Sequence, residues 1–233
     1  MITTILSLAT VTEMCSVAVL RGDQIVADHQ CWLGTRHAEK LLPMIVHVMK
    51  EAALDFSDLD KIAVAKGPGS FTGIRIGMAA ARGLALATSK PLLGVSSLEA
   101  IAQAVYSPGR GVLATLDARR GQIYAQSFSG HGIPNVEPSV MPPEDIGQLI
   151  FDKEYTVAGT GVSLVRPYLS ELPGYKENIV FDETEGLPRA SDIARAAVSQ
   201  QAETSSRSDI RPVYLRPPDA RRAFGKKTGI GSE

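Results

Sequence analysis

The sequence predicts an α/β protein in which one βββαβ unit occurs twice. Short runs rich in β-branched and apolar residues alternate with longer segments in which apolar residues recur at helical spacing. A strand, a turn and a returning strand are indicated in ILSLATVTEMCSVAV and again in VLATLDARRGQIYAQ. In each half a short buried strand leads into a glycine-containing loop, KIAVA before Gly67 and YTVAG at Gly159. Together, these observations indicate an internal duplication.

The first half opens with an antiparallel meander and continues into a helix. Strands are predicted at residues 2–8, 15–20 and 24–31, where short turns join them. Apolar residues then recur with a helical period up to Ala52. Pro43 falls inside this pattern, and we expect it to kink the helix or to mark an early break.

The first half then continues through a glycine loop. A short buried strand at residues 61–65 leads through this loop into a helix that we expect to reach about Ala87. A further strand is predicted at residues 91–95. Ser96 and Glu99 have the spacing of a capping box, which predicts another helix that begins there.

The second half repeats the order of elements in a shorter form. Its predicted elements are strands at 111–117, 122–129 and, weakly, within 134–143, a short helix at 142–150, a strand at 155–159 and an amphipathic helix at 188–203. We place the first unit at residues 1–106 and the second, with its closing helix, at residues 107–205. Residues 206–233 form a basic tail that we expect to be partly disordered.

The composition is that of an ordinary soluble globular protein. The chain has 233 residues, 44% of them hydrophobic and 21% charged, with a formal net charge of −1. A net charge near zero argues against a broad basic face for nucleic acid. Cys15 and Cys31 lack metal-ligand spacing, so we predict two core residues on neighbouring strands and a reducing compartment. No segment has the pattern of a signal peptide or a membrane span, and we therefore expect a cytoplasmic protein.

The segment KGPGSFTGIRIGMAAARGLALA, residues 66–87, has the most unusual local chemistry. A glycine loop between a strand and a helix can bind phosphate, but Gly67, Gly69 and Gly73 match neither the dinucleotide fingerprint nor a Walker loop. Ser70 would be a nucleophile only beside a positioned base, and nothing in the sequence ties a histidine to it. A turn or N-cap role is favoured for Ser70.

Small residues also form a stripe along the helix that follows the loop. Gly73, Gly77, Ala81 and Ala85 recur every four residues. Each glycine inside a helix costs roughly 1 kcal/mol relative to alanine, and close contact with another backbone would offset that cost. Packing is therefore favoured over phosphate binding and catalysis. The spacing leaves open whether the partner helix belongs to this chain or to another protein.

Four segments together resemble the bacterial TsaB family, also called YeaZ. They are KGPGSFTGIRIG (66–77), HAEKLLPMI (37–45), LDARRGQIYA (116–125) and PVYLR (212–216). The resemblance runs in register over nearly the whole chain. It implies a duplicated ribonuclease-H-like fold of the actin/Hsp70/sugar-kinase class, with mixed sheets. It also implies a non-catalytic role in making threonylcarbamoyladenosine on transfer RNA.

Two positions depart from what the resemblance implies for an active site. Ala9 stands at the end of the first strand, where most of the family has an aspartate. In active members of the superfamily, that aspartate helps to organise a metal ion and nucleotide phosphates. The catalytic paralogue has a metal-binding HxxxH on its first helix, whereas this chain has His37 followed by Leu41. Asp117 has the equivalent place in the second half, and the alternative role for it is a salt bridge in the turn with Arg119 or Arg120. We expect no catalytic residue and no metal ligand, and His37 as an exposed helix-start residue.

The resemblance also implies a partner surface. In this family the helices that carry HAEKLLPMI and FTGIRIGMAAARGLA form the surface for self-association and for the catalytic paralogue. We assign this interface to Leu41, Ile45, Gly73, Ile74, Gly77, Met78 and Ala81. A vestigial phosphate loop would comprise Gly67, Gly69, Ser70 and Thr72.

The implied partners are a TsaD-type catalytic paralogue and a small P-loop ATPase of the TsaE type, with a homodimer as an alternative. ATP and metal would bind to those subunits, so this chain would need no cofactor. Basic residues near the C-terminus would contact tRNA phosphates. These residues are Arg216, Arg221, Arg222, Lys226 and Lys227. Two enzyme hypotheses compete with this scaffold: a glycoprotease-like peptidase, and an ATPase that uses the Gly67–Gly73 loop.

Overall fold

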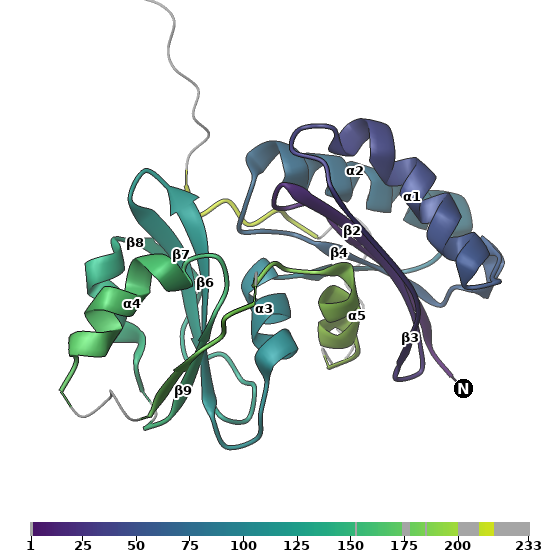
Figure 1. The fold of residues 1–233 in the computed structure, drawn as a ribbon. Helices are drawn as coiled ribbons and strands as arrows, with labels where there is room; N and C mark the ends of the chain where they lie inside the picture. Colours follow the sequence, from purple (N-terminus) through teal and green to yellow (C-terminus); the bar gives the residue numbers. More distant parts are fainter. Residues whose placement is uncertain (1, 152, 174–177, 185, 200–209, 217–233) are drawn as a thin grey trace, which may run out of the picture.

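The computed structural model describes residues 2–151, 153–173, 178–184, 186–199 and 210–216. Within this part of the chain, two five-stranded mixed sheets form two lobes that lie side by side (Figure 1). The strand order is β3-β2-β1-β4-β5 in the first sheet and β10-β9-β6-β7-β8 in the second. Because the second order, taken from its other end, has the same connectivity as the first, the predicted α/β fold and its duplication are confirmed.

In each lobe, three antiparallel strands come first and two parallel strands extend the sheet. The first sheet comprises β1 (Thr4–Ala9), β2 (Met14–Arg21), β3 (Gln24–Trp32), β4 (Lys61–Ala65) and β5 (Leu92–Val95). The second comprises β6 (Gly111–Arg119), β7 (Gln122–Phe128), β8 (Ser139–Met141), β9 (Tyr155–Ala158) and β10 (Ile179–Phe181). Cys15 on β2 lies directly across from Cys31 on β3, which confirms their predicted place on neighbouring strands.

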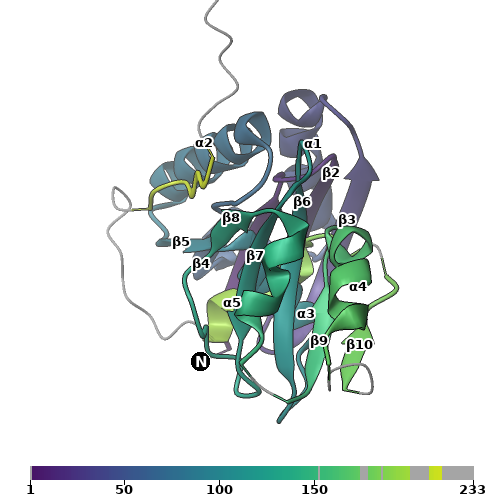
Figure 2. The ribbon, with the colours of Figure 1, turned by 90° about the vertical axis from the view of Figure 1, so that its left-hand side faces the viewer.

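Helices cover both faces of each sheet. They are α1 (His37–Glu51), α2 (Phe71–Thr88), α3 (Ser97–Val105), α4 (Val162–Glu171), α5 (Ala190–Ser199) and the 3-10 segments η1 (Phe56–Asp58) and η2 (Pro143–Leu149). The helices α1 and α2 lie next to each other on the outer face of the first sheet, while α4 and η2 cover the second sheet (Figure 2). The helices α3 and α5 lie between the two sheets (Figure 1).

The helix α1 continues through Pro43, so of the two expected alternatives, a kink or an early break, the early break is wrong. Pro43 is exposed, whereas the opposite side of α1 buries an apolar stripe in the core of the first lobe. Burial of that stripe outweighs the hydrogen bond that proline removes from the helix. The structure also contains three elements that the sequence did not predict, the 3-10 segment η1, α4 and β10.

The helix α5 packs on the first sheet, although it follows the second sheet in sequence. The amide of Ala190 donates to the Ser16 hydroxyl on β2 at 2.9 Å, and Ile193 is fully buried in the core of the first lobe. Conversely, α3 buries Leu98 and Ile101 in the core of the second lobe. The two lobes therefore exchange helices, and the unit boundaries that we placed at residues 106 and 205 stay a prediction.

Candidate functional site

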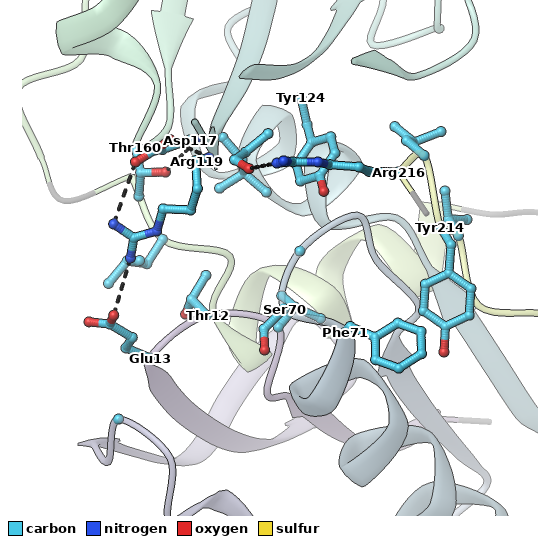
Figure 3. A pocket seen from close by; sticks show the side chains of 18 of the residues that line it. Thr12, Glu13, Ser70, Phe71, Asp117, Arg119, Tyr124, Thr160, Tyr214 and Arg216 are labelled. Atoms are coloured by element: carbon cyan, nitrogen blue, oxygen red, sulfur yellow. Dashed lines mark hydrogen bonds and ion pairs between the residues drawn. The ribbon is translucent and has the colours of Figure 1, made fainter. Parts of the chain in front are cut away.

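A cleft between the lobes contains a cavity of about 570 Å³. It lies at the ends of the central strands, where the β1–β2 turn and the glycine loop face the end of β6 (Figure 3). The side chains that face it include hydroxyls of Thr12, Ser70 and Thr160. Its charged lining residues are Glu13, Asp117, Arg119 and Arg216. Their formal charges cancel, so this lining does not select strongly for anions.

The glycines of the loop and of α2 allow the chain's own backbone to come close. A Cβ atom at Gly73 would overlap the carbonyl oxygen of Thr10, and one at Gly77 would overlap the Thr10 hydroxyl. At Gly69 it would overlap the carbonyl oxygen of Val11. Close packing is therefore confirmed at Gly73 and Gly77, but the neighbour is the β1–β2 turn of the same chain and not the expected helix. A Cβ atom at Gly83 would meet nothing within 4 Å in the described part of the chain, so close packing within the chain does not explain that glycine.

Ser70 is the N-cap of α2, as the sequence favoured. Its hydroxyl accepts a hydrogen bond from the Gly73 amide at 3.2 Å, which satisfies one of the free donors at the helix start. Its own amide donates to the carbonyl oxygen of Val11 at 2.8 Å and is not available to an anion. The phosphate-loop role of Gly67, Gly69, Ser70 and Thr72 stays a prediction.

Asp117, near the end of β6, is held in a charged network. Its carboxylate accepts the Arg119 amide at 2.7 Å, and the Arg119 guanidinium lies 3.6 Å from it. The same guanidinium pairs with Glu13 of the first lobe at 3.1 Å (Figure 3). The turn salt bridge that the sequence suggested for Asp117 is confirmed, and Arg119 links the lobes across the cleft. Because the Arg119 side chain is 72% exposed, this link adds little stability.

The corresponding position in the first lobe has no carboxylate. Ala9 is the last residue of β1 and is 1% exposed. Thr10 follows it, fully buried, and donates its hydroxyl hydrogen to the carbonyl oxygen of Gly73 at 2.7 Å. The end of β1 is thus used for packing against α2.

The expectation that His37 is exposed is wrong. His37 is 3% exposed, and its Nε2 atom is buried without a hydrogen-bond partner in the described part of the chain. The cause is the helical period: His37 lies on the same side of α1 as Leu41, Ile45 and Val48, all of them buried. This spacing was visible in the sequence and could have indicated its burial.

The predicted partner-interface residues are also buried within the chain, so this assignment is corrected. They are Leu41, Ile45, Gly73, Ile74, Gly77, Met78 and Ala81. The apolar spacing that singled them out marks the side of each helix that faces the sheet. The exposed apolar residues of the same helices include Leu42, Val46 and Leu86, which are 55%, 61% and 70% exposed.

Residues 213–216 form a wall of the cleft that the sequence did not indicate. Tyr214, Leu215 and Arg216 line the cavity beside the glycine loop (Figure 3). Arg216 is predicted as part of a basic tail, whereas its guanidinium donates to the carbonyl oxygen of Ala118 at 2.8 Å. The motif PVYLR was noted only for its resemblance, since no local pattern indicates such a long-range contact. The other basic tail residues, Arg221, Arg222, Lys226 and Lys227, lie outside the described residues.

Among the described residues, no group of three or more His, Cys, Asp or Glu side chains has an arrangement that could hold a metal ion. No helix in the described part of the chain is long and apolar enough to span a membrane.

The repeated lobes and the cleft at the ends of their central strands define the fold of the actin/Hsp70/sugar-kinase class. Component A of (R)-2-hydroxyglutaryl-CoA dehydratase from Acidaminococcus fermentans shares this fold, with a TM-score of 0.51 at 12% identity. That comparison covers 84% of this chain and 99% of the dehydratase component. The ribonuclease-H-like fold class that the resemblance implied is confirmed.

Sequence comparison gives a closer relationship. The tRNA threonylcarbamoyladenosine biosynthesis protein TsaB of Escherichia coli is 34% identical, over 91% of this chain and 94% of its own. YeaZ of Pseudomonas aeruginosa superposes with a TM-score of 0.78 at 33% identity, over 91% of this chain and 100% of that structure. A family model described as TsaD, tRNA N6-adenosine threonylcarbamoyltransferase, matches residues 33–140. The chain belongs to the TsaB family.

Proposed function

We propose that this chain is a non-catalytic subunit of the machinery that makes threonylcarbamoyladenosine on tRNA. Curated relatives named as biosynthesis proteins for this nucleoside support the pathway. The observation that carries the non-catalytic role is Ala9, at the position where active superfamily members use an aspartate. A methyl group cannot ligate Mg²⁺, which requires oxygen ligands.

The remaining carboxylates of the cleft support the same role. Asp117 accepts the amide of Arg119 and faces its guanidinium, which also pairs with Glu13. Both carboxylates are therefore paired with Arg119, which joins the end of β6 to the β1–β2 turn. ATP and metal would then bind to the partner subunits, as the resemblance implies.

The surface that we propose for assembly is the exposed side of α1 and α2. Leu42 and Val46 lie one turn apart on α1, and Leu86 lies on the neighbouring helix α2. All three are more than half exposed. Ala79 and Gly83, also exposed, add small residues to the outer side of α2, over which another helix could pack closely. We call this set the assembly face.

The partner that best fits the assembly face is the TsaD-type catalytic paralogue. The TsaD family model matches residues 33–140, a range that contains both α1 and α2. A TsaD-like partner would carry a corresponding helix pair, so the two pairs could meet about a pseudo-twofold axis. A homodimer through the same face would compete with this complex. The small TsaE-type ATPase would complete the assembly.

The experiment is reconstitution of tRNA modification with the paralogue, the small ATPase and the threonylcarbamoyl donor, with and without this chain. Leu86→Asp and Val46→Asp should weaken binding to the paralogue at least about tenfold and reduce modification in parallel. Val180→Asp is the matched control, because Val180 is also half exposed but lies on β10 of the other lobe. Full modification without the chain, or equal losses in the control, would refute the proposal.

The peptidase and the ATPase are less well supported. Ser70 caps α2, and His37 is buried without a partner at Nε2 in the residues described. The glycine loop packs against Val11 of the chain itself. Incubation of the isolated chain with ATP or with peptides tests both, and turnover above that of a heat-denatured sample would favour an enzyme. Contact of the basic C-terminal residues with tRNA phosphates remains part of the proposal.

A further inference from the structure

The segment Ile210–Arg216 crosses the cleft from one lobe to the other. In Figure 1 it is the yellow stretch between the two sheets. It contains no helix or strand. Three residues hold it in place: Ile210 by its buried side chain, Val213 by a backbone hydrogen bond and Arg216 by its guanidinium.

The anchor lies in the first lobe. Ile210 is 6% exposed and packs into the core of that lobe. Its carbonyl oxygen accepts a hydrogen bond from the Arg82 guanidinium of α2 at 2.6 Å. Further along, the amide of Val213 donates to the carbonyl oxygen of Lys66 at 2.7 Å, directly after β4. Tyr214 then stacks on Phe71, with ring centroids 4.9 Å apart.

Two glycines make room for this segment. A Cβ atom at Gly67 would lie 2.7 Å from the Val213 carbonyl oxygen, and one at Gly94 would lie 2.5 Å from Cγ2 of Ile210. Gly94 is an interior residue of β5, where glycine weakens a strand unless another group must approach closely. The two glycines therefore give the first lobe a surface against which residues 210–213 can pack closely.

The other end of the segment is held by the second lobe. The guanidinium of Arg216 donates to the carbonyl oxygen of Ala118 at 2.8 Å, and Leu215 packs against the core that contains Leu116 and Tyr124. The Arg119–Glu13 pair also crosses the cleft, but it is largely exposed. The segment therefore makes the better shielded connection between the lobes.

We propose that residues 210–216 are an inter-lobe latch that sets the opening of the cleft. With the latch in place, Val213 covers Gly67 and Tyr214 to Arg216 close one wall of the cavity. When the Arg216 end is released, the β6–β7 turn can move away from the glycine loop while Ile210 stays anchored. This property does not depend on the partner proteins, so its test is separate from that of the proposed function.

Hydrogen–deuterium exchange of the full chain tests the latch. Arg216→Ala removes the contact with Ala118, and Arg211→Ala is the matched control, because Arg211 is exposed and carries the same charge. We expect amides of the β1–β2 turn and of residues 119–121 to exchange about tenfold faster in Arg216→Ala, as expected for the loss of a charged hydrogen bond. The control should change them by less than about twofold.

A second variant acts on the other end of the latch. Val213→Pro removes the amide that binds the Lys66 carbonyl, and its effect should also reach residues 119–121 in the opposite lobe. Melting curves of each variant verify that the chain is folded at the temperature of exchange. Unchanged exchange at residues 119–121 in both folded variants would overturn the proposal, as would equal acceleration in Arg211→Ala.

Discussion

The glycines of α2 differ in what lies next to them, which leads to opposite predictions for two similar substitutions. Gly77 faces the Thr10 hydroxyl, which is fixed by its hydrogen bond to Gly73. Gly83 has open space around its Cα atom. Gly77→Ala should therefore lower the free energy of unfolding by about 1–3 kcal/mol, and Gly83→Ala should raise it by about 0.5–1 kcal/mol. Urea denaturation of the isolated chain measures both.

The stability of the Gly77→Ala variant also shows whether the close contact with Thr10 explains the glycine at this position. A Gly77→Ala variant as stable as the parent would show that Thr10 can shift at no cost, and the close approach would not explain the glycine. Substitutions here act on the fold of the chain itself. Partner binding is therefore better tested at Leu86 or Val46, whose side chains face outward.

The two cysteines should differ strongly in reactivity. Burial, and then the neighbouring Cys31, raise the pKa of the Cys15 thiol to about 12. At pH 8 the Cys15 thiolate is therefore scarce, and only the thiolate reacts with disulfide reagents. Native Cys31→Ser should react with such a reagent at least about a hundredfold more slowly than Cys15→Ser. Both variants should react fully in denaturant, and equal native rates would contradict the burial of Cys15.

Several residue roles followed from the sequence because their causes are local. The capping box of Ser96 and Glu99 and the N-cap role of Ser70 depend on residues within one helical turn. The prediction of an exposed His37 is wrong because it follows from the polarity of histidine, whereas the position of His37 on the buried stripe of α1 decides its burial. The contacts of Arg216 and Thr10 join residues far apart in the chain, so spacing could not indicate them.

At the scale of elements, α1 tests how much a proline costs inside a packed helix. Pro43 is exposed and leaves the carbonyl of Glu39 without its usual donor. Pro43→Ala should raise the free energy of unfolding by about 1–2 kcal/mol. The full difference in helix propensity is about 3 kcal/mol, and proline offsets part of it by restricting the unfolded chain. Urea denaturation checks this value, and a destabilised variant would mean that the proline ring itself contributes to packing.

The sequence did not predict α4 and β10, and the reason is the same for both. The helix α4 has only 10 residues and contains Pro167, so its apolar period is short and interrupted. The strand β10 has 3 residues at the edge of the second sheet. Both are stabilised by the lobe on which they pack, because short elements gain little from their own propensity. Long buried strands such as β1 and β6 were predicted within one or two residues of their observed ends.

At the scale of the whole molecule, the sequence predicted two similar units but not how they exchange elements. The helix α5 supplies Ile193, Ala194 and Ala197 to the core of the first lobe. Ile210 of the latch enters the same core. These residues are more than 80 positions away from the strands that they cover, and their amphipathic pattern shows only that one side is buried. The choice of sheet depends on the complete fold.

This exchange predicts that the first unit does not fold alone. Residues 1–106 without α5 would leave one face of β1, β2 and β4 exposed, together with the Ser16 hydroxyl that binds the Ala190 amide. Such a large apolar patch favours association or a loosely packed state. We therefore expect this fragment to lack a cooperative thermal transition, measured by circular dichroism, whereas the full chain should have one.

Addition of a peptide comprising residues 186–216 should restore the transition, because it supplies both α5 and the Ile210 anchor. The same peptide with Ile193→Asp is the control, since it places a charge at a fully buried position. If the fragment 1–106 unfolds cooperatively on its own, the first sheet does not need α5. The first lobe would then be an independent folding unit, and residue 106 would mark its end.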